Sequence, residues 1–355
     1  MDVREFAFTL PPELIAQEPP AIRGSSRLLH LDRRTGARTH TTIDRLATFL
    51  EAGDIVVVNN TQVFPARLLG RRQPSGGAVE CLLVTCVSSD DAGSREMWQA
   101  LMHPGQKLAP GAHVVFEREG VGILHGEVLE RHFHGRRTLR LWTEDGRSVR
   151  DVVDAIGHVP LPPYIRRDDR ADDRDRYQTV FARERGSIAA PTAGLHLTPQ
   201  IFENLADHGV QVVEITLHVG YGTFQPVRVE RVEDQRLEPE RYEVGQEAAA
   251  AIDAARNGRK RVVAVGTTTT RTLEAVARAN VGRVVAGAGA TDLFIYPGFQ
   301  FKVVSGLLTN FHLPASSLIM LVAAFAGRDA VMEAYADAIE RRYRFYSYGD
   351  AMLIT

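Results

Sequence analysis

The sequence predicts an α/β protein, with a three-layer α/β main domain and a small antiparallel β-barrel inserted into it. Apolar, β-branched runs at residues 54–58 and 261–265 are typical of strands buried on both faces of a parallel sheet, and helical patterns alternate with them. Between residues 63 and 150 the pattern changes to short alternating segments cut by turns, which is typical of a small barrel. The predicted boundaries are 1–60 and 155–355 for the main domain and 61–154 for the insertion.

Bulk composition excludes several classes of protein. The 355 residues are 44% apolar, which is enough for two domains with cores of their own. A formal net charge of −2 provides no overall positive field, so RNA binding would need a local basic patch. The most apolar run, residues 318–325, is too short to span a bilayer, and the charged start carries no secretory signal. We expect a cytoplasmic protein without a membrane partner, acting as a monomer.

The two cysteines, Cys81 and Cys86, have no second Cys/His pair at zinc spacing. We interpret them as buried free thiols on one strand and expect no metal.

The first part of the main domain begins with a proline-initiated helical turn within residues 10–17. A strand is expected at residues 25–31, and a helix at 43–50 should end before Gly53. The barrel strands are expected at residues 78–87, 97–102, 113–116, 122–129 and 138–142.

The second part of the main domain returns to alternating strands and helices. Strands are expected at residues 211–217, 261–265 and, at a sheet edge, 293–299; helices are expected at 246–255, 272–279, from 318 to about Gly327, and at 330–342. Residues 284–290 resemble a dinucleotide fingerprint only faintly, and we reject it because a strand rather than a helix follows.

Two segments rich in small residues, 186–198 and 216–227, are the core of the predicted site. Their glycines allow close approach of the backbone to a ligand, and each segment carries a histidine, His196 and His218. We expect the two segments to fold against each other and to enclose one shared pocket.

The hydroxyl-rich run at residues 267–271 follows a buried strand and precedes a helix. Backbone N–H groups and the positive end of a helix meet there, which suits a carboxylate or a phosphate. An ordinary N-cap is the alternative interpretation.

Two basic segments are candidates for RNA contact. The charged run at residues 166–176 is either a solvated loop or a rim that holds phosphate. The end at residues 343–350 combines aromatics with arginine, which can stack bases and hold phosphates, although it could also be a capping strand with a tyrosine-rich edge.

Longer strings now point to a family. Residues 187–198, 217–220, 222–224, 309–317 and 343–350 resemble the S-adenosylmethionine:tRNA ribosyltransferase-isomerases of queuosine biosynthesis. The likeness runs in order from about residue 5 to the C-terminus. Supporting strings are residues 14–17, 26–29, 64–67, 161–165, 177–182 and 265–274.

The resemblance implies a reaction. The ribosyl part of S-adenosylmethionine is transferred to the aminomethyl group of a 7-deazaguanine at the tRNA wobble position and is isomerised, which gives epoxyqueuosine, adenine and methionine. It implies S-adenosylmethionine as a consumed substrate with no bound cofactor, and the anticodon arm of tRNA as the partner. The family fold is similar to the one predicted above.

Two strings depart from the family pattern. Residues 60–62 read Asn-Thr-Gln where Asp-Thr-Arg is usual, and residues 235–240 read Gln-Arg-Leu-Glu-Pro-Glu where His-x-Met-His-Ser-Glu is expected. We interpret both as tolerated variants.

Such a reaction needs a base beside the sulfonium and a proton donor for adenine, and histidine serves both roles near neutral pH. A lone histidine among apolar residues is also often only structural. The candidate catalytic residues are His196, His218, His312, Tyr221 and Asp350. The candidate substrate-binding residues are Ser187, Pro191, Thr192, Gly194, Gly220, Gly222, Thr223, Phe224, Thr267, Thr268, Arg271 and Asn310. The candidate tRNA-binding residues are Arg166, Arg167, Arg344 and Tyr346.

Two rival functions remain at this point. An S-adenosylmethionine-dependent RNA methyltransferase would be expected to show a glycine-rich loop followed by an acidic strand end, and none is present. A non-catalytic RNA-binding protein with the same fold would be expected to carry more positive charge.

Overall fold

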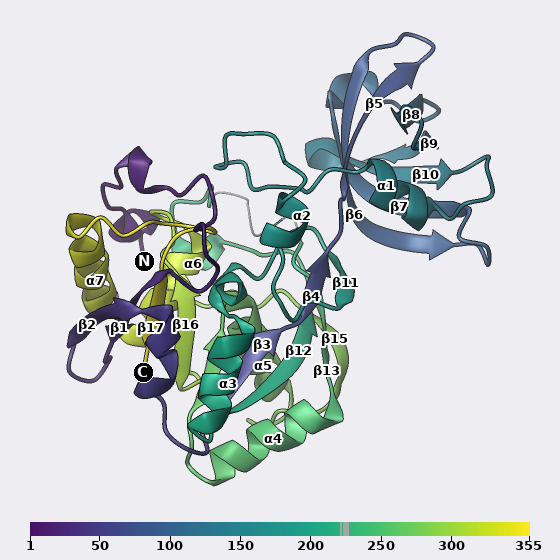
Figure 1. Cartoon of the computed structure of the whole chain (residues 1–355). Coiled ribbons are helices and arrows are strands. Elements are labelled where there is room, and N and C mark those ends of the chain that lie inside the picture. Colours follow the sequence, from purple (N-terminus) through teal and green to yellow (C-terminus); the bar gives the residue numbers. More distant parts are fainter. Residues whose placement is uncertain (221, 223–226) are drawn as a thin grey trace.

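A nine-stranded mixed sheet lies at the centre of the main body in the computed structural model, which describes residues 1–220, 222 and 227–355 (Figure 1). Within the described residues its strand order is β15-β13-β12-β3-β14-β16-β17-β1-β2. The strands are β1 Arg27–Leu31, β2 Arg38–Thr42, β3 Ile55–Asn59, β12 Gln211–Leu217, β13 Glu240–Val244, β14 Val262–Val265, β15 Gly287–Thr291, β16 Gly306–Asn310 and β17 Ala351–Ile354.

Helices cover both faces of this sheet and make three layers. All five residues of β3 are buried, and they alternate between the two faces. Ile55 and Val57 pack in one core with helices α4, α5, α6 and α7, whereas Val56 and Val58 pack in another with η3 and α3. The bounds are η3 Ile43–Phe49, α3 Pro199–Asp207, α4 Gln246–Asn257, α5 Thr267–Ala279, α6 Ser317–Ala326 and α7 Arg328–Glu340.

The four central strands β12, β3, β14 and β16 run parallel to one another. Their carboxyl ends therefore meet at one edge of the sheet, which is where α/β sheets bind ligands. His218 follows β12, Asn60 follows β3, Gly266 follows β14 and Phe311 follows β16. This edge faces the barrel.

The inserted unit is a closed six-stranded antiparallel barrel of order β10-β7-β6-β5-β8-β9. Its strands are β5 Arg67–Gln73, β6 Ala78–Ser89, β7 Arg95–His103, β8 His113–Arg118, β9 Gly122–Arg131 and β10 Arg136–Trp142. Five of them were predicted; β5 was missed because its alternation includes three arginines and a glycine. Helix α1, Val149–Ile156, packs its apolar side into the barrel core.

Both cysteines lie on β6 and are free, as predicted. Cys81 is buried, but Cys86 is half-buried, so the expectation of two buried thiols is wrong for Cys86.

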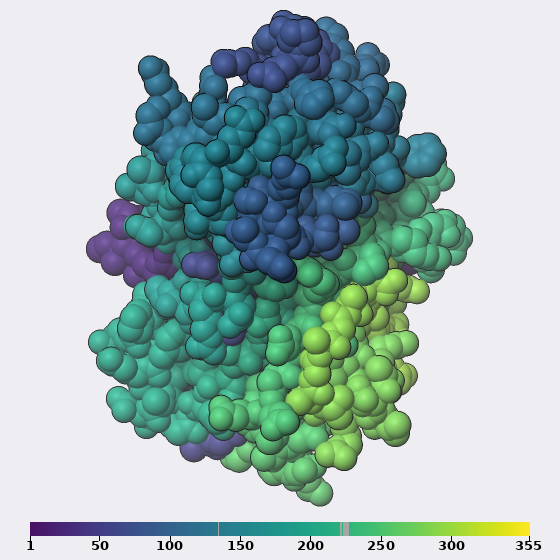
Figure 2. Space-filling model, turned by 90° about the vertical axis from the view of Figure 1, so that its right-hand side faces the viewer, coloured from purple at the N-terminus to yellow at the C-terminus, as the bar shows by residue number. Residues whose placement is uncertain are grey.

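A short parallel pair joins the two units: β4, Thr61–Val63, and β11, Glu184–Ser187. In the space-filling view the blue barrel residues lie directly over green and yellow segments of the main body (Figure 2). The remaining elements are η1 Val3–Phe6, η2 Pro12–Leu14, η4 Gly105–Lys107, η5 Phe133–Gly135, η6 Thr192–His196, η8 Val232–Asp234 and α2 Asp173–Arg176.

Three expected elements differ from the observed ones. Residues 293–299 form no strand; the edge strand is β15, just before them, which pairs with β13. Helix α5 begins at Thr267 rather than 272, because Thr269 and Thr270 hydroxyls donate to carbonyls four residues earlier and fit within its first turn. The helix expected at 43–50 is a 3-10 helix.

No helix among the described residues is long and apolar enough to cross a membrane.

Candidate functional site

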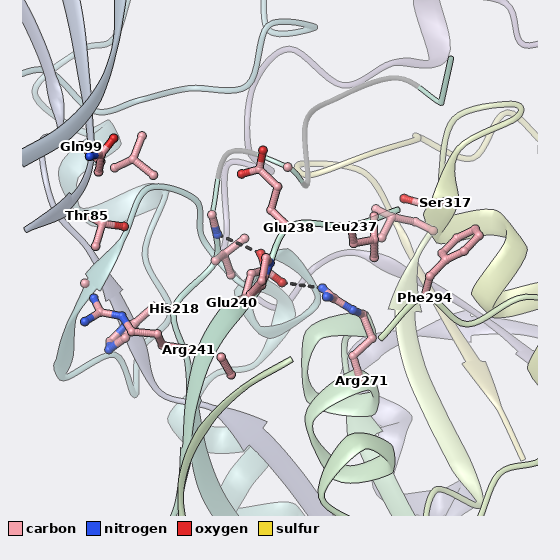
Figure 3. Close-up of a pocket in the computed structure, with 18 of the residues that line it drawn as sticks. Thr85, Gln99, His218, Leu237, Glu238, Glu240, Arg241, Arg271, Phe294 and Ser317 are labelled. Carbon is pink, nitrogen blue, oxygen red and sulfur yellow. Dashed lines mark hydrogen bonds and ion pairs between the residues drawn. The ribbon is translucent and has the colours of Figure 1, made fainter. Parts of the chain in front are cut away.

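A cavity of about 450 Å³ opens between the barrel and the carboxyl edge of the sheet (Figure 3). Thr85 and Gln99 line it from the barrel, and His218, Glu240 and Arg271 line it from the sheet and α5. We call it the main cavity. Its volume lies in the range of small-molecule sites.

His218 is the histidine of the main cavity. Its Nδ1 lies 2.8 Å from Oγ1 of Thr61, and that hydroxyl lies 2.9 Å from Oγ of Ser187. The backbone N–H of Val219 donates to the same Ser187 oxygen at 2.7 Å. Burial lowers the pKa of His218, and the nearby Arg241 lowers it further. The imidazole is therefore neutral at pH 7.

Gly186 allows this packing. A Cβ on Gly186 would lie 2.7 Å from both Cε1 and Nδ1 of His218, which is closer than side-chain carbons approach other atoms. The expected contact between the segments 186–198 and 216–227 is thus confirmed, since Gly186 and Ser187 both touch the second segment.

A buried ion pair forms the floor of the main cavity. Nη1 of Arg271 donates to Oε2 of Glu240, and the N–H of Gly220 donates to Oε1 of the same carboxylate at 2.9 Å. Arg271 is 7% exposed and Glu240 is 6% exposed, so water screens the electrostatic attraction between their two charges only weakly. Figure 3 shows the pair directly beneath the cavity.

A second, smaller cavity of about 50 Å³ adjoins the first, because Val219 and Leu318 line both. We call it the small cavity. Among its lining residues are seven of the predicted site: Pro191, Thr192, Thr267, Thr268, Asn310, His312 and Tyr346.

The first turn of α5 contributes the polar wall of the small cavity. Thr267 is 8% exposed, and its hydroxyl has no hydrogen-bond partner among the described residues. Thr268 accepts from Nδ2 of Asn59 at 3.5 Å. The simple N-cap interpretation fails, because Gly266 is the N-cap residue and supplies no side chain.

His218 lines the main cavity, whereas His196 lines neither the main nor the small cavity, so the expectation of one pocket shared by these two histidines is wrong. His196 lines a separate space of about 20 Å³. Its Nδ1 lies 2.9 Å from Oγ of Ser26, and its Nε2 lies 3.1 Å from Nδ2 of Asn310. Both ring nitrogens are therefore occupied, and burial lowers the pKa of His196 to about 4.

His312 is also neutral. Its Nε2 lies 2.9 Å from Oγ1 of Thr309, and burial lowers its pKa to about 3. It lines the small cavity, at the side formed by the end of β16.

Asp350 lines none of the described cavities. It is 2% exposed and accepts hydrogen bonds from the backbone N–H groups of Arg27 and Arg344 and from the guanidinium of Arg27. It connects the chain end to β1. This arrangement argues for a structural role in place of the predicted catalytic one.

Two further predicted residues have packing roles. Ser187 is fully buried and reaches the site only through Thr61 and Val219. Gly194 lies against Phe181 and Thr179, where an added Cβ would come within 3 Å of both side chains. Gly220 and Gly222 line the main cavity as predicted, and Tyr221, Thr223 and Phe224 lie outside the described residues.

The predicted RNA contacts are mostly engaged elsewhere. Arg167 binds Asp173 at 2.6 and 2.8 Å, and Asp173 is 3% exposed, so the expectation of a solvated loop is wrong for the centre of the 166–176 run. Arg344 lies 3.9 Å from Asp350. Arg166 is exposed and its guanidinium is unpaired among the described residues.

The chain end at residues 343–350 is neither an exposed aromatic surface nor a strand. Tyr343, Phe345 and Tyr348 are buried, and the segment turns before β17 begins. Tyr346 lines the small cavity instead, with its ring against Tyr164.

Sequence reasoning missed several residues of the main cavity. Glu238 and Glu240 lie in the string that departs from the family pattern: Glu240 keeps the expected glutamate, and Glu238 replaces a histidine. Glu238 forms an ion pair with Arg136 of the barrel, so the replacement has a partner of its own. Arg241, the next residue, is exposed at the cavity and has no ion pair among the described residues.

Within the other departing string, Thr61 is the position that keeps the usual residue, and it is the one that contacts His218. Asn60 is buried and bonds Glu214 and Thr216, away from the cavities. Among the described residues, no group of three or more His, Cys, Asp or Glu side chains is arranged to hold a metal ion.

Comparison with known proteins identifies the family of the chain. The family model described as "Queuosine biosynthesis protein" matches residues 3–354. The chain is 48% identical to the S-adenosylmethionine:tRNA ribosyltransferase-isomerase of Desulfitobacterium hafniense and 47% identical to that of Heliobacterium modesticaldum, with 100% of each chain covered. A crystal structure of S-adenosylmethionine tRNA ribosyltransferase from Thermotoga maritima matches with 38% identity and a TM-score of 0.55, covering 99% of this chain and 100% of that one.

Proposed function

Because the chain belongs to the queuosine biosynthesis protein family, we propose that it is an S-adenosylmethionine-dependent tRNA ribosyltransferase-isomerase. It transfers the ribosyl part of S-adenosylmethionine to the aminomethyl group of a 7-deazaguanine at the tRNA wobble position and isomerises it. Adenine and methionine leave. The single observation that carries the assignment of residues is a neutral, half-buried histidine in a cavity of ligand size at the carboxyl edge of the sheet.

His218 is the general base in this proposal. The carbonyl of Glu184 can only accept, and the Thr61 hydroxyl donates to it at 3.4 Å. The Thr61 oxygen then accepts hydrogen bonds from the hydroxyl of Ser187 and from an N–H at Nδ1 of His218, so the ring proton of the neutral imidazole lies on Nδ1. Nε2 of His218, which has no partner among the described residues, is left unprotonated and can take the proton next to the sulfonium.

Two carboxylates of the main cavity would face a sulfonium nucleoside, and each is paired with an arginine, Glu238 with Arg136 and Glu240 with Arg271. We place the carboxylate oxygens of Glu238 and Glu240 beside the positive sulfonium, because they are the acidic groups of the cavity wall. Gly220 and Gly222 keep the cavity wall free of side chains on that side.

The small cavity would take the amino acid part of the substrate. A volume of about 50 Å³ holds a few water-sized groups, which is the size of a carboxylate with its ammonium neighbour. The free hydroxyl of Thr267 and the N-terminus of the 13-residue helix α5 favour a negative charge there. Thr192 and Asn310, joined by a 3.2 Å hydrogen bond, lie at the same wall.

His196 and His312 then serve as positioning residues. Both are neutral at pH 7, and His196 holds Asn310 at the wall of the small cavity. Of the predicted RNA contacts, Arg166 keeps a free guanidinium and remains a candidate.

The test is single-turnover release of adenine from S-adenosylmethionine with tRNA that carries the aminomethyl-deazaguanine. Wild-type protein should release adenine, whereas a methyltransferase would transfer a methyl group and a binding protein would release nothing. His218→Gln should slow release by roughly 100- to 10,000-fold. His208→Gln is the matched control, because His208 is exposed and bonds only a backbone carbonyl of its own helix. Equal rates for the two variants would refute the role of His218, and absence of adenine with wild-type protein would refute the function.

A further inference from the structure

A third hollow, of about 1090 Å³, lies at one end of the barrel and is separate from the main and small cavities. The ends of β6, β7, β9 and β10 form it together with η4 and η5. Residues with charge or aromatic character in its wall are Glu80, His103, Lys107, Arg131, His132, Phe133 and Arg137. We call it the barrel-end hollow.

The hollow is positively charged. Lys107 and Arg131 have no acidic partner within 4 Å among the described residues. Glu80 lines the same wall, but it is paired with Arg67 at 2.8 Å and contributes little net charge. Glu130 lies just outside, 3.5 Å from His132.

Arg137 adds a buried positive charge beneath the hollow. It is 1% exposed and donates to the backbone carbonyls of Leu108, Gly105 and Arg136, and no described carboxylate lies within ion-pair distance. Burying a charge without an opposite one is unfavourable for folding alone. The carbonyls satisfy its hydrogen bonds while its charge still projects a positive potential into the hollow, which suits an anionic ligand.

An aromatic ring stands at the rim. Phe133, in the connection between β9 and β10, is 88% exposed. An exposed aromatic next to unpaired cations is the combination that single-stranded nucleic acid sites use, since the bases stack and the phosphates are neutralised.

The hollow and the main cavity lie along the same three strands. On β6, Thr85 lines the main cavity and Leu82 lines the hollow. On β7, Gln99 lines the main cavity and Leu101 lines the hollow. On β10, Arg136 lines the main cavity and Arg137 lines the hollow. The two spaces are therefore no more than three residues apart along each of these strands, which places a nucleic acid at the barrel end close to the main cavity.

We propose that the barrel-end hollow binds the loop of the tRNA anticodon arm, with Lys107 and Arg131 on phosphates and Phe133 stacked on a base. The inference rests on the proposed function and deepens it, because it assigns the RNA-binding surface of the same site. It moves that surface from Arg167 and Arg344, which are paired with carboxylates, to the barrel.

The test measures binding of a fluorescent anticodon stem-loop RNA across a range of salt concentrations. Lys107→Gln/Arg131→Gln should reduce the slope of log affinity against log salt by about 1.5, which corresponds to two lost phosphate contacts. Phe133→Ala should weaken binding by about 5- to 100-fold through the lost stacking. The affinity for S-adenosylmethionine alone should stay at the wild-type value in both variants, because these side chains lie outside the main cavity.

The matched controls lie at the other end of β9. Arg118→Gln removes an exposed arginine, unpaired among the described residues, from the end of β8, and Ile123→Ala removes an apolar side chain that is 48% exposed at the start of β9. Neither control should change RNA affinity or its salt slope. Circular dichroism and thermal unfolding should show all variants folded, because every changed side chain is at the surface.

An unchanged RNA affinity and salt slope in the barrel-end variants would overturn the inference, and it is the result expected if the surface holds an acidic protein instead. Equal losses in the Arg118→Gln control would also overturn it. If the barrel-end variants alone lose RNA affinity while wild-type protein releases no adenine, the surface stands and the proposed function fails.

Discussion

The substitution Gly186→Ala offers a sharp test of the catalytic geometry, because it changes the position of His218 without removing it. The new Cβ would lie 2.7 Å from Cε1 and Nδ1 of the imidazole. Carbon atoms in contact stay about 3.5 to 4.0 Å apart, so the ring must move by about 1 Å. This movement breaks the 2.8 Å contact between Nδ1 and Thr61.

A displacement of about 1 Å in a catalytic group costs on the order of 100-fold in rate. We therefore expect single-turnover adenine release to fall by about that factor in Gly186→Ala. The free energy of unfolding should fall by about 2 to 4 kcal/mol, the cost of one lost hydrogen bond, local repacking and an alanine at the φ of 158° that Gly186 adopts. Single-turnover reactions stopped at set times, with adenine separated and quantified, would measure the rate. Denaturant titrations would measure the free energy of unfolding.

Gly258→Ala is the matched control. A Cβ there would meet its nearest neighbours at 3.4 Å, which is ordinary contact, and the residue ends α4 with φ of −76°. If Gly186→Ala released adenine as fast as Gly258→Ala, the imidazole of His218 would not be the base, and the reasoning from the close contact would be refuted.

Three further predictions concern buried ionisable groups. The first concerns pH: His196 and His312 have folded pKa values of about 4 and about 3 against an ordinary 6.5, so below pH 6.5 the unfolded chain binds more protons than the native one. The stability that these two groups contribute is complete above pH 6.5 and declines as pH falls, by up to about 2.7 kcal/mol per pH unit from about pH 6 to pH 4. In His312→Gln, the free energy of unfolding from denaturant titrations should depend less steeply on pH than in the wild type. Equal slopes in the variant and the wild type would contradict the assignment. Second, Glu240→Gln should destabilise the protein by about 3 kcal/mol in denaturant titrations, because Arg271 loses its carboxylate while still buried; a stability equal to that of the exposed-site variant Glu247→Gln would show that the pair is not required. Third, Asp350→Asn should lower the melting temperature while the folded fraction keeps its single-turnover rate, because Asp350 holds Arg27 and lines none of the described cavities; a stable variant with a slowed rate would restore its catalytic role.

The sequence by itself determined the fold class and most of its elements. The β-branched run around Val56 and the alternation in the barrel follow from local periodicity, which each segment carries within itself. The two site segments were also evident, since glycines and small side chains are needed wherever a backbone approaches a ligand or another chain segment closely.

Tertiary structure decided which of the candidate side chains meet. Three histidines in similar strings are equivalent in sequence, but only His218 lines the main cavity, whereas His196 has both nitrogens occupied. Arg167 and Arg344 are ion-paired because Asp173 and Asp350 lie beside them in the fold. Lys107 and Arg131 have no ion pair because no carboxylate of the described barrel lies close enough to them. The burial and the ion pairing of a side chain depend on residues that lie far from it in the sequence, so no local sequence pattern predicts them.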